Sequence, residues 1–292
     1  MTWIHYSFLM YISSVVTYLA LRVLQRRKIP SEINNFFMWL FSAVTFISIA
    51  LFKWEFPGLE LKYIVFLLMT AFFLSYLGQK VSLEGIRKAS NPGYSLMIQK
   101  SYAIYTAIAA VLLFDSELTV KSIFAILIVI SFLVLIVKSD EKTHSKTESK
   151  EWVRDSFLAF FAFGTNALAA NWLLEQGVEP FVRGFYVMIF LSMLFAIDLF
   201  RKNLKDKRLY NYLKDLNAYP WFVIMGVTTG LFNLTMQYAY DLTPNVGYVN
   251  ILNTASIAAI TLLSALIFKE GLTLKKFIGV QGVSVGIILL II

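Results

Sequence analysis

Residues 91–121 read NPGYSLMIQKSYAIYTAIAAVLLFDSELTVK, and a related stretch, NVGYVNILNTASIAAITLLSALIFKEGLTLK, occupies residues 245–275. Both stretches begin with N-x-G-Y, continue in an apolar run of equal length and end with L-T-x-K. Each run is about as long as an α-helix that crosses a bilayer, which takes roughly 20 apolar residues. Because these features recur in one register, the sequence predicts an internal duplication.

The composition of the whole chain predicts a membrane protein. Hydrophobic residues make up 58% of the 292 residues and charged residues only 15%, whereas a soluble domain is about a quarter charged. The net charge of +8 does not indicate nucleic-acid binding, because the basic residues lie in short connectors and no nucleic-acid motif accompanies them. Basic connectors are instead typical of the cytoplasmic side of membrane proteins.

Apolar segments of spanning length predict ten transmembrane helices and no strands. Their approximate ranges are 3–21, 34–52, 62–83, 94–114, 120–137, 153–174, 181–199, 220–240, 246–267 and 273–292.

The duplication divides these helices into two five-helix repeats, 1–138 and 153–292, joined by a polar linker at 139–152. Five is an odd number, so the second repeat must enter the membrane from the opposite side. The predicted fold is an all-α integral membrane protein with two inverted-topology repeats, an architecture typical of secondary transporters.

The turns that flank these spans carry a family resemblance. A short connection, K88-A-S-N-P92 or L242-T-P-N-V246, precedes a span that ends in D115-S-E-L-T119 or K269-E-G-L-T273. With these motifs the chain resembles the drug/metabolite transporter (DMT) superfamily, specifically its ten-span EamA-type members. The E-x-L-T of the second copy matches the family's usual turn, whereas Glu117 of the first copy lies one place later. The resemblance implies a transport fold whose cavity is lined by the first, third and fourth helices of each repeat.

Two arguments about orientation disagree. Most lysines and arginines lie in the connectors that follow odd-numbered spans, and the positive-inside rule places these connectors in the cytoplasm. Both termini would then lie outside, whereas the family resemblance implies that both lie inside. We prefer the charge argument.

Polar residues at helical spacing within the spans predict the substrate site, because polar groups in lipid must face a partner or a water-filled cavity. They fall on the repeat-equivalent spans one and six, three and eight, and four and nine. The predicted substrate-binding residues are Tyr94, Gln99, Lys100, Asn166, Asn171, Asn233, Gln237 and Asn253. The alternative is that these side chains only join helices through interhelical hydrogen bonds.

Lys100 is the most informative of these residues, because a charged lysine near a helix centre costs about 2.5–3.5 kcal/mol on insertion scales. Its ammonium group can extend to the near interface, pair with Glu84 or lose its proton by burial, or face the cavity and bind an anionic substrate group. The resemblance favours the third interpretation, since sugar-phosphate and nucleotide-sugar branches of the superfamily often carry a Q-x-x-K-like pattern here. In Q99-K100-S101 the lysine matches but the glutamine spacing does not. Glu84 is also the candidate for coupling transport to a proton.

We expect a secondary transporter of a small polar metabolite that works by alternating access, and the family analogy favours export. One alternative is a translocase of a lipid-linked sugar or amine. Another is an importer of a cationic, quaternary amine metabolite bound by aromatic rings, for which the candidates are Tyr94, Tyr102, Trp172, Tyr240 and Tyr248. A receptor or scaffold without a transport cycle is a further possibility.

The sequence contains no catalytic or metal-binding motif, so we expect no enzyme activity and no cofactor. The expected partners are a small-molecule substrate, the bilayer (most simply the plasma membrane) and a coupling proton. G282-V-S-V-G286 permits close helix approach, either within a monomer or in a homodimer.

Overall fold

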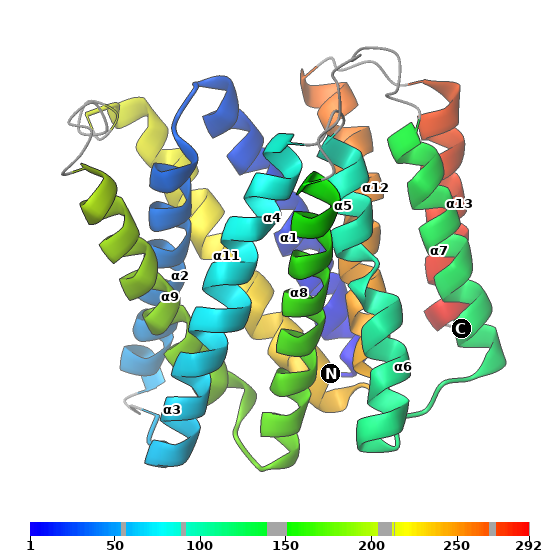
Figure 1. Ribbon diagram of the computed structural model, residues 1–292, viewed down its shortest axis with the longest axis horizontal. Helices are drawn as coiled ribbons and strands as arrows, with labels where there is room; N and C mark the ends of the chain where they lie inside the picture. The colour runs from blue at the N-terminus through cyan, green and yellow to red at the C-terminus, as the bar shows by residue number, and fades with distance from the viewer. Residues whose placement is uncertain are drawn as a thin grey trace.

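The computed structural model describes residues 1–53, 57–88, 92–138, 151–203, 212, 214–268 and 273–291, and this part of the chain contains helices but no strand. The helices run side by side across the molecule (Figure 1). Their bounds are α1 Trp3–Arg26, α2 Ser31–Lys53, α3 Leu61–Thr70, the π-helix η1 Ala71–Tyr76, α4 Leu77–Lys88, α5 Pro92–Lys100, α6 Tyr102–Phe114, α7 Val120–Lys138, α8 Glu151–Glu175, α9 Pro180–Asn203, the 3₁₀ turn η2 Leu216–Ala218, α11 Tyr219–Leu242, α12 Val246–Phe268 and α13 Leu274–Ile291.

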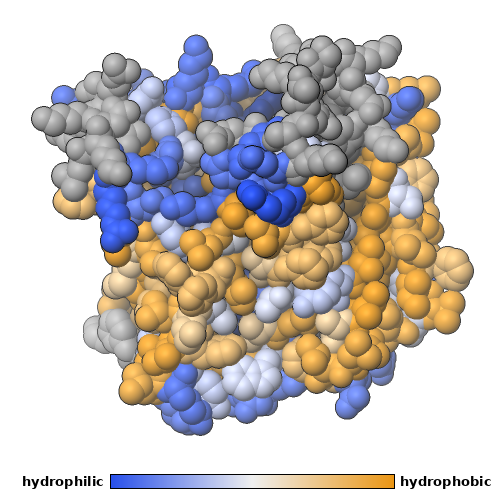
Figure 2. Space-filling view, viewed as in Figure 1, coloured by the Kyte–Doolittle hydropathy of each residue, from blue (hydrophilic) through white to orange (hydrophobic). Residues whose placement is uncertain are grey.

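The outer surface of the helices is suited to lipid. Large side chains such as Phe8 (62% exposed) and Leu112 (79% exposed) point away from the molecule, and Figure 2 shows a broad hydrophobic band between two hydrophilic edges. In the described chain, seven helices are long and apolar enough to cross a membrane: Trp3–Arg26, Ser31–Lys53, Leu61–Ile86, Glu151–Glu175, Pro180–Lys202, Val246–Phe268 and Leu274–Ile291. The prediction of a multi-pass, all-helical membrane protein is therefore confirmed.

The count of ten spans and the inverted repeats stay predictions. The shorter apolar helices Ile98–Phe114 and Val120–Ile136 lie in predicted spans four and five, and α11 occupies the range predicted for span eight. The predicted linker 139–152 lies outside the described residues up to residue 150, and α8 begins at Glu151. The division into repeats at 1–138 and 153–292 is likewise untested.

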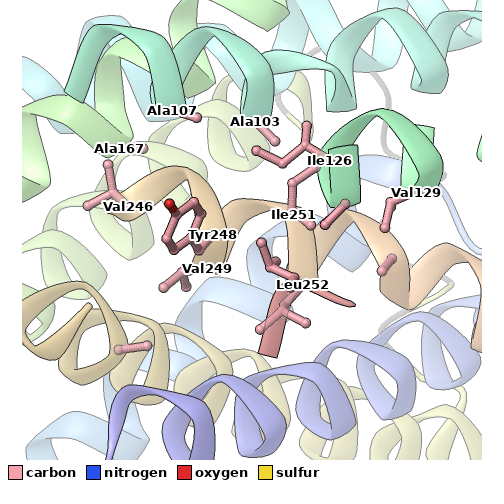
Figure 3. Packing of buried hydrophobic residues seen from close by; sticks show 14 of the residues in the cluster. Ala103, Ala107, Ile126, Val129, Ala167, Val246, Tyr248, Val249, Ile251 and Leu252 are labelled. Carbon is pink, nitrogen blue, oxygen red and sulfur yellow. The ribbon is translucent and has the colours of Figure 1, made fainter. Parts of the chain in front are cut away.

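The two halves of the chain interlock, because helices of one half pack against helices of the other. The α1 helix lies along α11, α7 lies along α13, and α4 packs on α8. One apolar cluster, shown in part in Figure 3, draws on α6, α7, α8 and α12 through residues such as Ala107, Val129, Ala167 and Ile251. Small residues predominate where helices approach closely, as expected where van der Waals packing drives association.

Polar contacts join helix ends at one hydrophilic edge. Lys202 Nζ lies 2.8 Å from Glu32 Oε1, which joins the end of α9 to the start of α2. Arg26 donates to the Phe268 carbonyl oxygen over 3.1 Å, which joins the ends of α1 and α12. These helix ends belong to the connectors in which the sequence concentrates its basic residues, although the side of the membrane on which they lie stays a prediction.

Two of the predicted spans are not regular α-helices. The π-helix Ala71–Tyr76 separates α3 from α4, and Ser101 (φ −65°, ψ −3°) separates α5 from α6. Such irregularities are tolerated in a membrane when other groups satisfy the freed backbone atoms. Here the Ser101 hydroxyl donates to the Ile98 carbonyl oxygen over 2.7 Å, and the Thr254 hydroxyl donates to the Lys100 carbonyl oxygen over 3.3 Å.

The G-x-x-x-G of α13 packs within the monomer, against α7. A Cβ atom on Gly282 would lie 2.1 Å from Cγ of Phe132, and one on Gly286 would lie 2.6 Å from Cγ2 of Val129. This contact uses the face that dimerisation through the same motif would need.

We expect Gly282→Leu to lower the free energy of unfolding by about 1–3 kcal/mol, the usual cost of overpacking. The gain in helix propensity, up to about 1 kcal/mol, does not offset a clash with a ring. The midpoint of thermal unfolding in detergent measures the effect, and Val285→Leu, at a position 58% exposed on the same helix, is the control. Equal midpoints for wild type and Gly282→Leu would contradict the α7–α13 contact.

Candidate substrate site

Lys100 is the last residue of α5, directly at the helix interruption. The half-buried side chain makes no hydrogen bond or ion pair with any described residue. Its ammonium group lies within electrostatic range of the phenol groups of Tyr18 and Tyr102. The C-terminal end of α5 and the N-terminal end of α6 meet at this interruption, so backbone groups of both helix ends lie near the lysine.

A hydrogen-bonded bridge beside Lys100 joins three helices. The hydroxyls of Tyr240 on α11 and Tyr102 on α6 both donate to Oδ1 of Asn250 on α12, over 2.6 and 3.4 Å. Asn250 Nδ2 donates in turn to the Thr106 hydroxyl over 2.9 Å, and Asn253 Nδ2 donates to the Tyr102 hydroxyl over 3.4 Å. We call these groups the tyrosine–asparagine bridge. Of the predicted site residues, the structure places Lys100 and Asn253 around it, both next to Tyr102.

The predicted pair between Lys100 and Glu84 is not among the ion pairs of the described residues. Glu84 Oε2 lies 4.0 Å from Lys88 Nζ, which also contacts Glu151 at 3.2 Å and Asp155 at 2.8 Å. Glu84 therefore belongs to a charged cluster where α4 ends and α8 begins. Of the described carboxylates, none forms an ion pair with Lys100.

Gln99 lies in a different environment from Lys100, although the two are adjacent in sequence. Its carboxamide accepts from the Ser82 hydroxyl over 2.6 Å and donates to the Ser82 carbonyl oxygen and the Ser95 hydroxyl. The Ser95 hydroxyl is bonded to that of Ser156 on α8 over 2.7 Å. Gln99 is 1% exposed and fully bonded, so it joins α4, α5 and α8.

We expect Gln99→Leu to lower the free energy of unfolding by about 1–3 kcal/mol, because it leaves buried serine groups without partners. A residue that only binds substrate would show the opposite pattern, with unchanged stability and weaker ligand binding. Thermal unfolding of the ligand-free protein distinguishes the two, with Leu96→Met on the same helix as the control. An unchanged midpoint would favour the substrate-binding role that the sequence predicts.

The other predicted site residues are spread over the molecule. Asn233 Nδ2 donates to the Thr229 carbonyl oxygen of its own helix over 2.9 Å, and Asn166 is half-buried on α8. Asn171 donates to Glu175 over 3.2 Å near the end of α8. Gln237 is 2% exposed, and its side-chain oxygen has no hydrogen-bond partner. Tyr94 belongs to α5, but its side chain lies outside the described part of the chain.

The aromatic residues proposed for a cation cage do not form one cluster among the described ring contacts. Tyr102 lies against Phe163, Trp172 against Phe66 and Tyr248 against Trp3. The hydroxyls of Tyr102 and Tyr240 are engaged in the bridge.

A cavity of about 460 Å³ opens where α8 and α11 end, next to the bridge. Tyr240 and Asn171 contribute to its wall, together with the carboxylates of Asp115, Glu117, Glu175 and Asp241. Its described lining contains no lysine or arginine. We call it the acidic pocket.

Two charged residues within the predicted spans are not among the site residues that the sequence predicts. Lys80 Nζ lies 3.1 Å from Asp198 Oδ1 and 3.0 Å from the Tyr76 hydroxyl, which joins α4, α9 and η1. Arg183 on α9 is 3% exposed. It lies close to the start of predicted span 181–199, where an arginine looks interfacial, so only the packing around it shows that it is buried.

Comparison with known proteins finds a family match in the second half of the chain and a shared fold over its whole length. Residues 156–292 match the EamA-like transporter family. A solved structure titled "Crystal structure of protein" has the same fold, with a TM-score of 0.75 and 13% sequence identity, over 98% of this chain and 97% of that chain. No curated protein matches the chain.

The apolar helices define a multi-pass membrane protein, and residues 156–292, somewhat less than half of the chain, are similar to a transporter family. The EamA-like family is a transporter family, which agrees with the expectation that the protein is not an enzyme.

Proposed function

We propose that the protein is a secondary active transporter of a small anionic metabolite, working by alternating access around Lys100. The observation that carries this proposal is a lysine at a helix interruption, inside the bundle, with no ion-pair partner among the described residues. An unpaired charge is costly in a membrane interior and marks a functional site by default. A substrate carboxylate or phosphate supplies the missing counter-charge.

The helix interruption supports the same proposal. Transporter sites near the bilayer midplane are typically built from discontinuous helices, whose N-terminal ends face anionic groups. The N-terminus of α6 lies beside Lys100. The tyrosine–asparagine bridge closes one end of this region, because it holds α6 against α11 and α12. Breaking the bridge would open a path to Lys100 from that end, and remaking it would close the path again.

The proposal includes a direction of transport and a source of energy. With the basic connectors in the cytoplasm of a plasma-membrane protein, the acidic pocket faces outside, and export of the anion agrees with the family resemblance. Glu84 is the proposed site of a coupling proton, because its carboxylate is 44% exposed beside Lys88. In that role Glu84→Gln would uncouple flux from a pH gradient without abolishing exchange.

A cationic metabolite is the second candidate substrate, and the acidic pocket favours it. The carboxylates of Asp115, Glu117, Glu175 and Asp241 around one cavity attract a cation. Lys100 opposes this reading, because it would repel the cation deeper in the bundle.

Counterflow in proteoliposomes tests the proposed function. Vesicles containing the purified protein and loaded with an unlabelled carboxylate or phosphate ester should accumulate the labelled form of the same solute, and protein-free vesicles should not. Accumulation of quaternary amines alone would establish the second candidate. No counterflow of any solute would contradict transport and favour a receptor or scaffold. A requirement for lipid-linked solutes would identify a translocase.

A further inference from the structure

Arg183 is a buried arginine without a counter-charge in the described chain. The residue is 3% exposed, its Nε–H group has no hydrogen-bond partner, and its side chain forms no ion pair with a described residue. Glu179 lies one helical turn away, but it is exposed and bonds Arg183 only through the backbone. Buried arginines are almost always paired, so Arg183 requires a functional explanation.

Two more unpartnered polar atoms lie on α11, which packs against the helix of Arg183, and on α1, which packs against α11. The Gln237 Oε1 atom on α11 and the Ser7 Oγ atom on α1 are buried without partners. The α1 and α11 helices are antiparallel, since Tyr6 stacks on Tyr238 at 5.1 Å and Thr17 bonds to Thr228 at 2.7 Å. This register places Ser7 at the level of Gln237.

Arg183 lies at the same level. The α9 helix begins at Pro180, shortly after α8 ends at Glu175, and Glu175 and Tyr240 line the same cavity at the ends of α8 and α11. Since α9 packs against α11, the start of α9 lies at the level of Tyr240, which is one helical turn from Gln237. Arg183, Gln237 and Ser7 thus supply three of the five unpartnered buried side-chain atoms in the described chain. Buried polar atoms normally have partners, so their concentration here indicates a place for a polar ligand. The guanidinium requires an anion, and the Gln237 oxygen requires a donor.

Arg183 and Lys100 stand at the two ends of the tyrosine–asparagine bridge. Arg183 lies at the start of α9, at the level of Tyr240, and Lys100 lies two residues before Tyr102. Both tyrosine hydroxyls donate to the same Asn250 oxygen. The two cations therefore flank one short polar connection. With a single negative charge bound between them, one cation would stay uncompensated inside the membrane, whereas two negative charges would compensate both.

We propose that the substrate is a small organic dianion, with one anionic group bound by Arg183 and the other by Lys100. This inference rests on the proposed function and adds the charge of the substrate to it. Gln237 and Ser7 would bind a hydroxyl or amino substituent beside the Arg183-bound group. The ligand takes the place of the bridge hydrogen bonds when α11 and α12 move away from α6.

Matched pairs of acids test the charge of the ligand. The purified full-length protein is titrated calorimetrically at pH 7.5 with succinate against butyrate, and with malate against 3-hydroxybutyrate. Within each pair, a carboxylate replaces a methyl group and little else changes. We expect the dianion of at least one pair to bind at least tenfold more tightly than its monoanion. Equal affinities within both pairs, or no binding by either dianion, would overturn the proposal.

Variants then assign the second anionic group to Arg183. Arg183→Gln should reduce dianion affinity at least tenfold and leave monoanion affinity within threefold, because the monoanion binds at Lys100. Arg183→Lys should retain part of the preference for dianions. Arg201→Gln, on the exposed end of the same helix, should behave as wild type. Full preference for dianions in Arg183→Gln would overturn the assignment, and the wild-type comparison decides the charge of the ligand even if this variant does not fold.

The counterflow assay separates failure of this inference from failure of the proposed function. If monoanions and dianions show counterflow at the same rate, transport is established but the inference that the substrate is a dianion is overturned. Absence of counterflow for every solute would contradict the proposed function itself.

Discussion

We expect Lys100→Met to weaken the binding of anionic ligands about tenfold to a hundredfold and at the same time to make the ligand-free protein more stable. Removing a charge-assisted hydrogen bond of about 1.5–3 kcal/mol weakens anion binding about tenfold to a hundredfold, at 1.4 kcal/mol for each factor of ten. The ligand-free protein gains stability because a charged lysine near a helix centre costs about 2.5–3.5 kcal/mol on insertion scales. Methionine fills a similar volume without the charge.

The opposite signs of these two effects distinguish the possible roles of Lys100. If Lys100 had a structural role, either in an ion pair or at the membrane interface, Lys100→Met would lower the stability of the protein and leave ligand binding unchanged. Thermal unfolding of both proteins, with and without carboxylates, measures the two effects in one experiment, since a ligand present at a hundred times its Kd stabilises by about 2.7 kcal/mol. Lys80→Met is the matched control, because Lys80 is a partly exposed lysine within a predicted span that is already paired with Asp198.

Asn250→Leu should have the largest effect on stability in the molecule, at least about 3 kcal/mol. Asn250 is fully buried, and leucine would leave the Tyr240 hydroxyl without a partner and remove one of two hydrogen bonds from each of the Tyr102 and Thr106 hydroxyls. Each buried group left unpaired costs about 1–3 kcal/mol. Denaturant or thermal unfolding in detergent measures the loss.

A second substitution checks the cause of that loss. Tyr240→Phe in the Asn250→Leu background should restore part of the stability, because removing both partners of a hydrogen bond is nearly neutral. Asn253→Leu, on the same helix with only the long 3.4 Å bond to Tyr102, should lose less than Asn250→Leu. A loss below about 1 kcal/mol for Asn250→Leu would mean that the bridge does not hold the three helices together.

The sequence predicted the helices and their lipid environment well, because both depend on long apolar segments. Interruptions inside a span are harder to predict. Ser101 and the segment Ala71–Tyr76 are apolar or small and carry no breaking residue, so only interhelical contacts such as that of Thr254 with the Lys100 carbonyl show where the helix changes.

The candidate site was predicted only in part, because the sequence does not show which hydrogen-bond or ion-pair partners each polar residue has. Lys100 is conspicuous because it interrupts an apolar run, whereas Arg183 sits near a span end and resembles an interfacial residue. Gln99 and Lys100 are neighbours in sequence, yet Gln99 is fully bonded between helices and Lys100 is not. Helical spacing identifies the polar face of a helix but cannot show which polar groups already have partners.

In the proposed transport of an anion, the acidic pocket would give the two sides of the membrane unequal affinities. Its carboxylates lower the local concentration of anions at that mouth, so we expect an anionic solute to have a higher KM there and to diffuse away more readily after release. Fixed charges cannot set the final concentration ratio across the membrane, which depends on the driving force alone. The carboxylates favour release of the anion over its rebinding at that side. The difference in KM between the two sides should decrease as added salt shortens the Debye length below about 8 Å.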